Sequence, residues 1–474
     1  MRAGYLLNSM FHARTFQILV FLACISVSVG SLQMSRDSHE EEIDRTIQEC
    51  LLQDGTPSAS VAIVRDGQIV YAKAFGKSSL KPPVLATPQT RYQLASLSKT
   101  FTAQAILLLA AQKKLSLDDT VSRWYPDLTE ASKITLRQLL SHTAGFPDHY
   151  PERYPAGPKS KAAAPEAIIE EWGHHPLLFP PGTQFRYSNL DYVIAGRIVE
   201  KVSGEPLFQF FSKYIFQPVG MTAALDLDKL PENSPALATG YVRVALAPLR
   251  AAPYEGPGWS YGSGQVVTTA KDVALWDVAF LRHQTLPEPE ATEEITPVKL
   301  ANGSEAPTAL GLFVSHQDGV TRYYHTGEGL GFVAVNLIYP DSHFALVVLC
   351  NTNATATNLK IAYRLIYFLV PPGRKEAMAR KLFTGLQTGH PDESLFSDHL
   401  KQYLTASLLR DYHTSLAPLG LVKSFIADPV KTTDGMETRE YSISIGRHCV
   451  KLHLLILPNG LIEDIVVTKL HCEE

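Results

Sequence analysis

Residues 95–100 read ASLSKT and lead directly into an apolar stretch, TFTAQAILLLAAQKK, that begins at Thr100. This stretch predicts a helix that is buried on most of its sides. If the helix begins at Ser96, then Ser96 and Lys99 share one face, with their Cβ atoms about 5–6 Å apart. A serine hydroxyl becomes nucleophilic when a base takes its proton, and a buried, neutral lysine amine can act as that base. Ser98 points elsewhere because it directly precedes Lys99. The spacing alone also fits a solvated helix start.

A second polar group follows in a predicted loop. Tyr187-Ser188-Asn189 comes shortly after a Pro-Pro-Gly turn at residues 180–182. A phenol beside a cationic lysine can have a lowered pKa and relay protons. The Asn189 amide can orient both a substrate carbonyl and a lysine. Taken alone, these residues are equally well explained by local hydrogen bonds within a loop.

A third group, His325-Thr326-Gly327 followed by Glu328, precedes the strand-like run GLGFVAVNLIYP. Glycine in a strand lets another backbone approach closely. The next backbone N–H group can then point into an oxyanion hole. For this tripeptide alone, a surface turn before a strand is the simpler interpretation.

Together, S-x-x-K, Tyr-x-Asn and Lys/His-Thr-Gly are the combination found in penicillin-recognising enzymes. The chain closely resembles the serine β-lactamase and penicillin-binding-protein family. It is most similar to the branch that contains class C β-lactamases, D-alanyl-D-alanine carboxypeptidases and related esterases. The resemblance covers about residues 40–370 and includes LSLDDTVSRWYPD, LRQLLSHTAGFPDH, FPPGTQFRYSNLDYVIAGRIVEKVSG and GSGQVVTTAKDVALW. It implies an α+β, β-lactamase-like domain, in which helices flank an antiparallel sheet and an all-helical subdomain is added.

The resemblance also implies a role for each motif residue. Ser96 matches the acylated nucleophile, and Lys99 and Tyr187 match the groups that share its proton transfer. Asn189 matches the amide that orients the substrate. The remaining substrate-binding positions are His325, Thr326, Gly327 and Glu328, of which Glu328 joins Ser96 in supplying the backbone N–H groups of the oxyanion hole. We therefore expect a serine hydrolase that acts through a Ser96 acyl-enzyme on a small ester, amide or peptide substrate. We expect no cofactor, no metal and no nucleic-acid partner.

Two departures from the family pattern bear on the substrate. β-Lactamases carry lysine where this chain has His325, and a neutral imidazole cannot hold a carboxylate as an ammonium does. Glu328 stands where the family usually has a small residue, and it would raise the pKa of His325 if the two side chains approached each other. Both changes predict a preference for neutral esters or amides over substrates with a free carboxylate. The alternative is a catalytically idle scaffold of the same fold that binds peptides or self-assembles.

Composition and patterning suggest how the chain is divided. Its 474 residues are 45% hydrophobic and 19% charged, with a formal net charge of −4, which is ordinary for a globular protein and gives no nucleic-acid footprint. We predict a signal peptide at residues 1–30, the serine hydrolase domain at 38–370 and a polar linker at 371–397. Residues 398–474 are predicted to form a small α+β domain of unknown role.

The predicted signal peptide rests on the apolar run FQILVFLACISVSV at residues 16–29, which two arginines precede. It indicates a secreted or periplasmic protein, and an uncleaved membrane anchor is the alternative. Cys449 and Cys472 could pair in an oxidising compartment or remain separate thiols. The other histidines, including His142, have no metal-ligand spacing and are interpreted as structural or surface residues.

Overall fold

The computed structural model describes residues 39–150, 158–232, 234–433 and 435–470. The chain divides into two compact units, residues 1–49 and residues 50–474. In the first unit the described residues, 39–49, are helical. The predicted signal peptide lies outside the described residues. The other helices and strands belong to the second unit.

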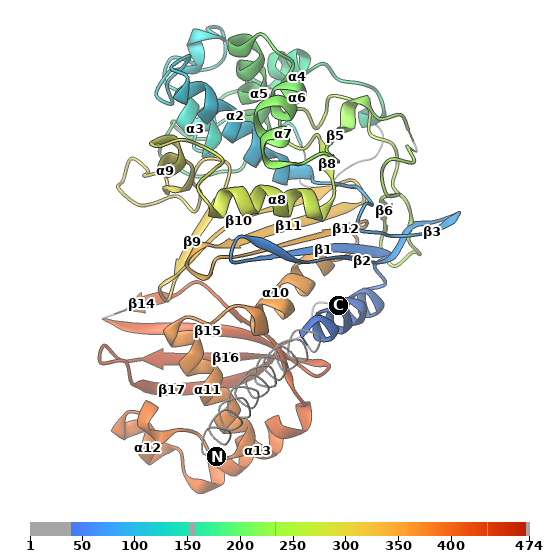
Figure 1. Cartoon of the computed structure of the whole chain (residues 1–474). Coiled ribbons are helices and arrows are strands. Elements are labelled where there is room, and N and C mark those ends of the chain that lie inside the picture. The colour runs from blue at the N-terminus through green and yellow to red at the C-terminus, as the bar shows by residue number, and fades with distance from the viewer. Residues whose placement is uncertain (1–38, 151–157, 233, 434, 471–474) are drawn as a thin grey trace, which may run out of the picture. The chain divides into compact units, whose positions relative to one another are not determined.

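A seven-stranded antiparallel sheet forms the centre of this unit (Figure 1). The first two strands are joined at Asp66-Gly67, where both residues have positive φ, 51° and 70°, as a tight hairpin turn requires. The two inner strands β11 and β12 are buried along their whole length. In spatial order the strands are β3 (Pro83–Leu85), β2 (Gln68–Leu80), β1 (Ser58–Arg65), β12 (Phe344–Cys350), β11 (Phe332–Tyr339), β10 (Val320–Gly329) and β9 (Phe313–Gln317).

Helices cover both faces of the sheet, which explains the continuous apolar runs of its inner strands. Helix α8 (Ala270–Leu281) packs on β1 and β12 from one face, and α10 (Thr357–Leu369) packs on β12 and β11 from the other (Figure 1). Short strands complete this region: β4 (Tyr92–Gln93), β8 (Val266–Thr268) and β5 (Leu225–Asp226) form one small sheet, and β6 (Tyr241–Val242) pairs with β7 (Arg250–Ala251).

A helical subdomain surrounds the predicted apolar helix, α2 (Lys99–Ala111), most of whose residues are buried. It packs chiefly on α5 (Asn189–Ser203). The other helices of this region are α3 (Leu136–Leu140), α4 (Pro165–Trp172), α6 (Leu207–Phe211), α7 (Gln217–Val219) and α9 (Glu290–Ile295). The predicted α+β class, with an antiparallel sheet, flanking helices and a helical subdomain, is confirmed.

The C-terminal residues have a hydrophobic core of their own. Its sheet has the order β13-β15-β16-β17, with β14 paired to β15. The elements are α11 (Arg374–Thr388), α12 (Asp398–Tyr403), α13 (Ala406–Leu416), β13 (Val422–Ala427), β14 (Lys431–Thr433), β15 (Met436–Ile445), β16 (His448–Ile456) and β17 (Ile462–Leu470).

The prediction of a linker at residues 371–397 is wrong for most of its length. Residues 374–388 form α11, and Leu382, Phe383 and Leu386 on one side of this helix belong to the C-terminal core. The charged residues of α11 lie on its other sides, so the polar composition of the segment hid an amphipathic helix.

The described cysteines differ in state. Cys50 and Cys350 are buried and reduced, whereas Cys449 is disulfide-bonded. Cys472 lies outside the described residues. Within the described ranges, no helix is both long enough and apolar enough to cross a membrane.

Candidate active site

Ser96 lies in a single 3₁₀ turn, Ala95–Ser98, that leads into α2. A 3₁₀ helix has three residues per turn, so side chains at positions i and i+3 are aligned. The Lys99 Nζ atom accordingly lies 3.0 Å from Ser96 Oγ. The two side chains meet as the sequence predicts, although the α-helix begins at Lys99. Ala95 has a φ of 47°, in the left-handed region that non-glycine residues rarely adopt, which is a form of backbone strain often found at functional sites.

Lys99 is fully buried, and three neutral oxygen atoms accept hydrogen bonds from its amine. Besides Ser96 Oγ, these are Asn189 Oδ1 at 2.7 Å and the Ser263 carbonyl at 2.9 Å. Burial lowers the pKa of Lys99 from 10.5 to about 7, because removing water disfavours the charged amine. The negative charges of Asp148 and Asp191 oppose this shift without cancelling it. Near neutral pH a substantial fraction of the amine is therefore uncharged and able to accept a proton.

The Tyr187 ring packs beside this amine. Lys99 Nζ lies 4.8 Å from the centre of the Tyr187 ring. The centres of the His142 and Tyr187 rings are 4.3 Å apart. The Tyr187 and His325 rings are 6.5 Å apart. Tyr187 is thus held between aromatic neighbours within reach of the lysine.

Asn189 is the first residue of α5, and Asp148 fixes the orientation of its amide. Asn189 Nδ2 donates to Asp148 Oδ2 at 3.0 Å, and its backbone N–H donates to Asp148 Oδ1 at 3.1 Å. The amide nitrogen is therefore engaged, and the amide oxygen faces Lys99. Burial raises the pKa of Asp148, while its hydrogen bonds favour the carboxylate. The sequence analysis did not single out Asp148, since nothing in one sequence shows that it contacts Asn189.

Strand β10 brings the third motif to the serine. A Cβ atom added to Gly327 would lie 2.0 Å from the carbonyl oxygen of Leu94, two residues before Ser96. Only glycine allows the strand to approach the 3₁₀ turn this closely. Gly327 is therefore explained by backbone packing, and Thr326 beside it is half-buried at the same edge.

His325 is buried and carries no charge at neutral pH. Its Nδ1 atom lies 2.6 Å from the Thr326 carbonyl, and because a carbonyl only accepts, this nitrogen bears the proton. Burial, with a smaller contribution from the Lys99 charge, lowers the pKa of His325 to about 3. β10 therefore presents a neutral imidazole beside Tyr187.

Glu328 does not approach His325, so the condition for the expected rise in the pKa of His325 is not met. Residues three apart on a strand point to opposite faces, and Glu328 is exposed, where Asn353 Nδ2 donates to it at 3.5 Å. The pKa of His325 is lowered rather than raised. The structure therefore separates Glu328 from the other predicted site side chains, and only its backbone adjoins the site.

His142 forms a layer behind Tyr187. It is buried, its Nδ1 atom lies 3.3 Å from Asp191 Oδ2, and the backbone N–H of Ser188 donates to the same nitrogen at 3.3 Å. Burial lowers the pKa of His142 and raises that of Asp191, and both shifts favour the uncharged forms of these side chains. No cluster of three potential metal-ligating side chains occurs among the residues that the structure describes.

The fold and this convergence of three motifs on a buried lysine are typical of the serine β-lactamase and penicillin-binding-protein superfamily. The Beta-lactamase family model matches residues 43–369, more than half of the chain, and the chain belongs to this family.

Curated relatives are similar over most of the chain. "Protein flp" of Staphylococcus aureus (strain MW2) is 27% identical over 336 residues, which cover 68% of this chain and 65% of that protein. The chain thus spans less than two thirds of the length of the staphylococcal relative. "Penicillin-binding protein 4*" of Bacillus subtilis (strain 168) is 26% identical over 401 residues, covering 80% of this chain and 88% of that protein.

Solved structures share the fold. The octameric penicillin-binding protein homologue from Pyrococcus abyssi superimposes with a TM-score of 0.60 at 21% identity, covering 90% of this chain and 99% of that chain. The D-stereospecific amidohydrolase from Streptomyces sp. has a TM-score of 0.59 at 24% identity, covering 69% and 99%. At these identities the likeness shows the fold alone.

Proposed function

We propose that this protein is an acyl-transfer serine hydrolase that acts through Ser96 on neutral esters, amides or peptides. One observation carries the proposal: the amine of Lys99 lies 3.0 Å from Ser96 Oγ and has a pKa of about 7. A general base is most effective when its pKa is close to the working pH. A lysine with only a packing role would need neither this contact with a serine hydroxyl nor a pKa near 7.

The geometry supports a two-step reaction. Neutral Lys99 takes the proton of Ser96 as Oγ attacks the substrate carbonyl, and the negative charge moves to the carbonyl oxygen. When the tetrahedral intermediate collapses, the lysine proton passes to the leaving alcohol or amine and an acyl-enzyme remains. Water then attacks the ester carbonyl, its proton passes to the same base, and the acid product leaves with Ser96 restored. Tyr187, beside Lys99, is proposed to share the proton transfers.

The charge of the site supports a neutral substrate. β10 contributes a neutral imidazole at His325, which would not attract a substrate carboxylate. The Streptomyces neighbour, a D-stereospecific amidohydrolase by its title, indicates that this fold can accommodate amide hydrolysis.

The activity is tested with a fluorophosphonate probe and a p-nitrophenyl ester. We expect a mass adduct on Ser96, and a fall in ester kcat/KM of at least about 10³-fold in Ser96→Ala. The control variant Ser122→Ala changes a half-buried serine on a turn remote in sequence and should turn over as wild type does. Equal, near-background rates in wild type and Ser96→Ala, with no adduct, would instead support the idle scaffold.

Substrate choice is tested by restoring the charge pattern of the β-lactamases. The double variant His325→Lys with Glu328→Ser adds a cation at the site and removes the exposed carboxylate on the other face of β10. We expect the ratio of kcat/KM for a penicillin to that for a neutral ester to rise in this variant. An unchanged ratio, or a wild type that already prefers the penicillin, would show that pocket shape decides the substrate.

We further propose that the protein enters the secretory route. The apolar run at residues 16–29 and the disulfide at Cys449 both support this proposal. N-terminal sequencing of the expressed protein should show a start near residue 31, whereas an intact Met1 would favour an uncleaved anchor or an intracellular protein.

A further inference from the structure

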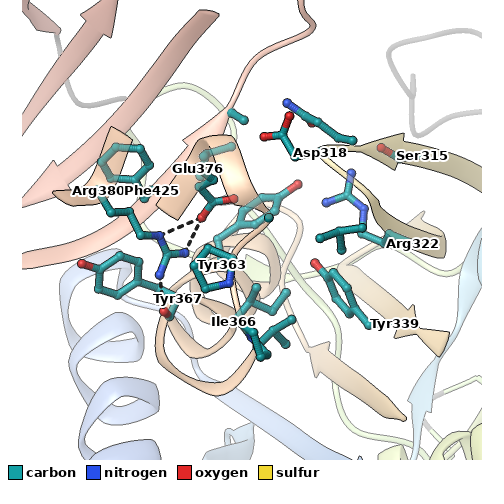
Figure 2. A pocket seen from close by; sticks show the side chains of 18 residues that line it. Ser315, Asp318, Arg322, Tyr339, Tyr363, Ile366, Tyr367, Glu376, Arg380 and Phe425 are labelled. Carbon is teal, nitrogen blue, oxygen red and sulfur yellow. Dashed lines mark hydrogen bonds and ion pairs between the residues drawn. The ribbon is translucent and has the colours of Figure 1, made fainter. Parts of the chain in front are cut away.

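A cavity of about 130 Å³ lies away from Ser96, and none of the predicted site residues lines it. It is formed by β9 and β10, the end of α10, the start of α11 and β13 (Figure 2). Its polar lining includes Ser315, Asp318, Arg322, Tyr339, Glu376 and Arg380.

The two acidic side chains of the lining are already paired. Glu376 accepts a hydrogen bond from Arg380 Nε at 2.8 Å, as the dashed lines in Figure 2 show. Asp318 forms an ion pair with Arg439, with 2.5 Å between Oδ1 and Nη1. Each acidic side chain of the lining therefore has a guanidinium partner, although Arg439 also pairs with Glu437.

Arg322 is the cation left over. Within the described ranges no carboxylate lies within ion-pair distance of it, and its buried Nε atom has no hydrogen-bond partner. Its neighbours are aromatic: the guanidinium lies 4.6 Å from the centre of the Tyr324 ring, and Tyr339 is hydrogen-bonded to it. A buried guanidinium donor without an acceptor is unfavourable, and an anion bound beside it would satisfy this donor.

We propose that this cavity binds a small oxyanion, a carboxylate or a phosphate, on the guanidinium of Arg322. The planar fork of arginine matches such groups with two parallel hydrogen bonds. Tyr339 and Tyr363 place hydroxyl groups in the same lining, and the first residues of α11 face it with the positive end of the helix. Figure 2 shows Arg322, Tyr339 and Tyr363 around the same space.

The free space of about 130 Å³ is enough for a small ligand, and the cavity is open on one side. Acetate, a short-chain acid or inorganic phosphate is of this size. Hydrolysis of a neutral ester or amide would release a carboxylate, so the ligand class includes small acid products of the proposed reaction. The binding site itself does not depend on that activity.

The test is a titration of the full chain observed on the ligand by NMR, with ¹³C-acetate and ³¹P-phosphate as separate probes at constant ionic strength. We expect saturable binding of at least one probe, and the probe that binds more tightly identifies the anion. Arg322→Gln should weaken this binding at least tenfold. The control Arg250→Gln removes the same charge from an exposed position on β7 and should bind as wild type does.

A second variant guards against misfolding of Arg322→Gln. Ser315→Phe should fill the cavity from β9 and abolish saturable binding while leaving Arg322 in place. Binding that survives both variants would place the anion elsewhere, and the absence of saturable binding in the folded wild type would overturn the proposal. Because neither readout uses turnover, failure of the proposed hydrolase activity would leave this result unaffected.

Discussion

Replacing Lys99 with methionine should abolish ester turnover and yet stabilise the folded protein at neutral pH. Methionine fills a similar volume without a charge, so the variant removes the buried amine and leaves the surrounding packing in place. The expected gain follows from the pKa of Lys99. It falls from 10.5 to about 7 on folding, and one pH unit of displacement corresponds to about 1.4 kcal/mol. Burying the amine thus costs about 5 kcal/mol at pH 7.

Part of this gain is lost again because the variant breaks three hydrogen bonds. The Lys99 amine donates to Ser96, Asn189 and Ser263, and each bond contributes about 1 kcal/mol to stability. We therefore expect a net stabilisation of about 2 kcal/mol at pH 7. Between pH 7 and 10.5 the unfolded chain binds a proton that the folded protein has released, so the wild type gains stability as the pH rises. The advantage of methionine should accordingly shrink and reverse toward pH 10.

Urea unfolding at pH 7 and at pH 9.5 measures this difference. Ser96→Ala is the matched control, because it loses activity but keeps the buried lysine and should therefore retain the wild-type dependence on pH. A methionine variant that is less stable than wild type at pH 7, or a difference that does not change with pH, would refute the reasoning. Either result would mean that Lys99 is buried as a stable ammonium.

Four further outcomes are expected. In the wild type, kcat/KM for a neutral ester should rise with pH through about 7 as Lys99 loses its proton, and a profile that is flat there would place the base elsewhere. Asn189→Asp should raise the pKa of Lys99 by bringing a carboxylate against it, which moves the rising limb of the same profile to higher pH. Burial raises the pKa of Asp277 from 3.8 to about 8. Between these pH values the folded protein binds one more proton than the unfolded chain, so its stability falls as the pH rises. Asp277→Asn should reduce the slope of the unfolding free energy against pH, measured by urea unfolding, by up to about 1.4 kcal/mol per pH unit. Gly327→Ala should lower kcat/KM more than tenfold while unfolding stays cooperative, since the added Cβ would meet the carbonyl oxygen of Leu94 at 2.0 Å.

The local part of the site was predictable because it depends on few residues. Ser96 and Lys99 are three positions apart, and both a 3₁₀ turn and an α-helix place such side chains together. The placement of Asn189 and His325 beside them came from the family resemblance, because no local pattern links segments so distant in the chain. Asp148 was missed because its contact with Asn189 depends on how two loops meet.

The sequence contains patterns that indicate the orientation of Glu328 and the amphipathic character of α11. Glu328 and His325 are an odd number of residues apart on a predicted strand, so their side chains should have been placed on opposite faces. In α11, Leu382 and Leu386 are four residues apart with Phe383 beside them, which is a helical stripe within a polar segment. The Ser263 carbonyl, by contrast, had no signal, because every residue carries the same backbone group.

The neutral hydrogen-bond acceptors around Lys99 explain why its buried amine can be uncharged near neutral pH. A carboxylate in direct contact would favour the ammonium and hold the lysine protonated. The structure instead presents Ser96 Oγ, the Asn189 amide oxygen and the Ser263 carbonyl to the amine. The nearest supporting carboxylate, Asp148, bonds to the far side of the Asn189 amide and orients it. Asp148 thus orients the Asn189 amide, and the amide keeps the Asp148 carboxylate out of direct contact with Lys99. Burial therefore remains the largest influence on the pKa of Lys99.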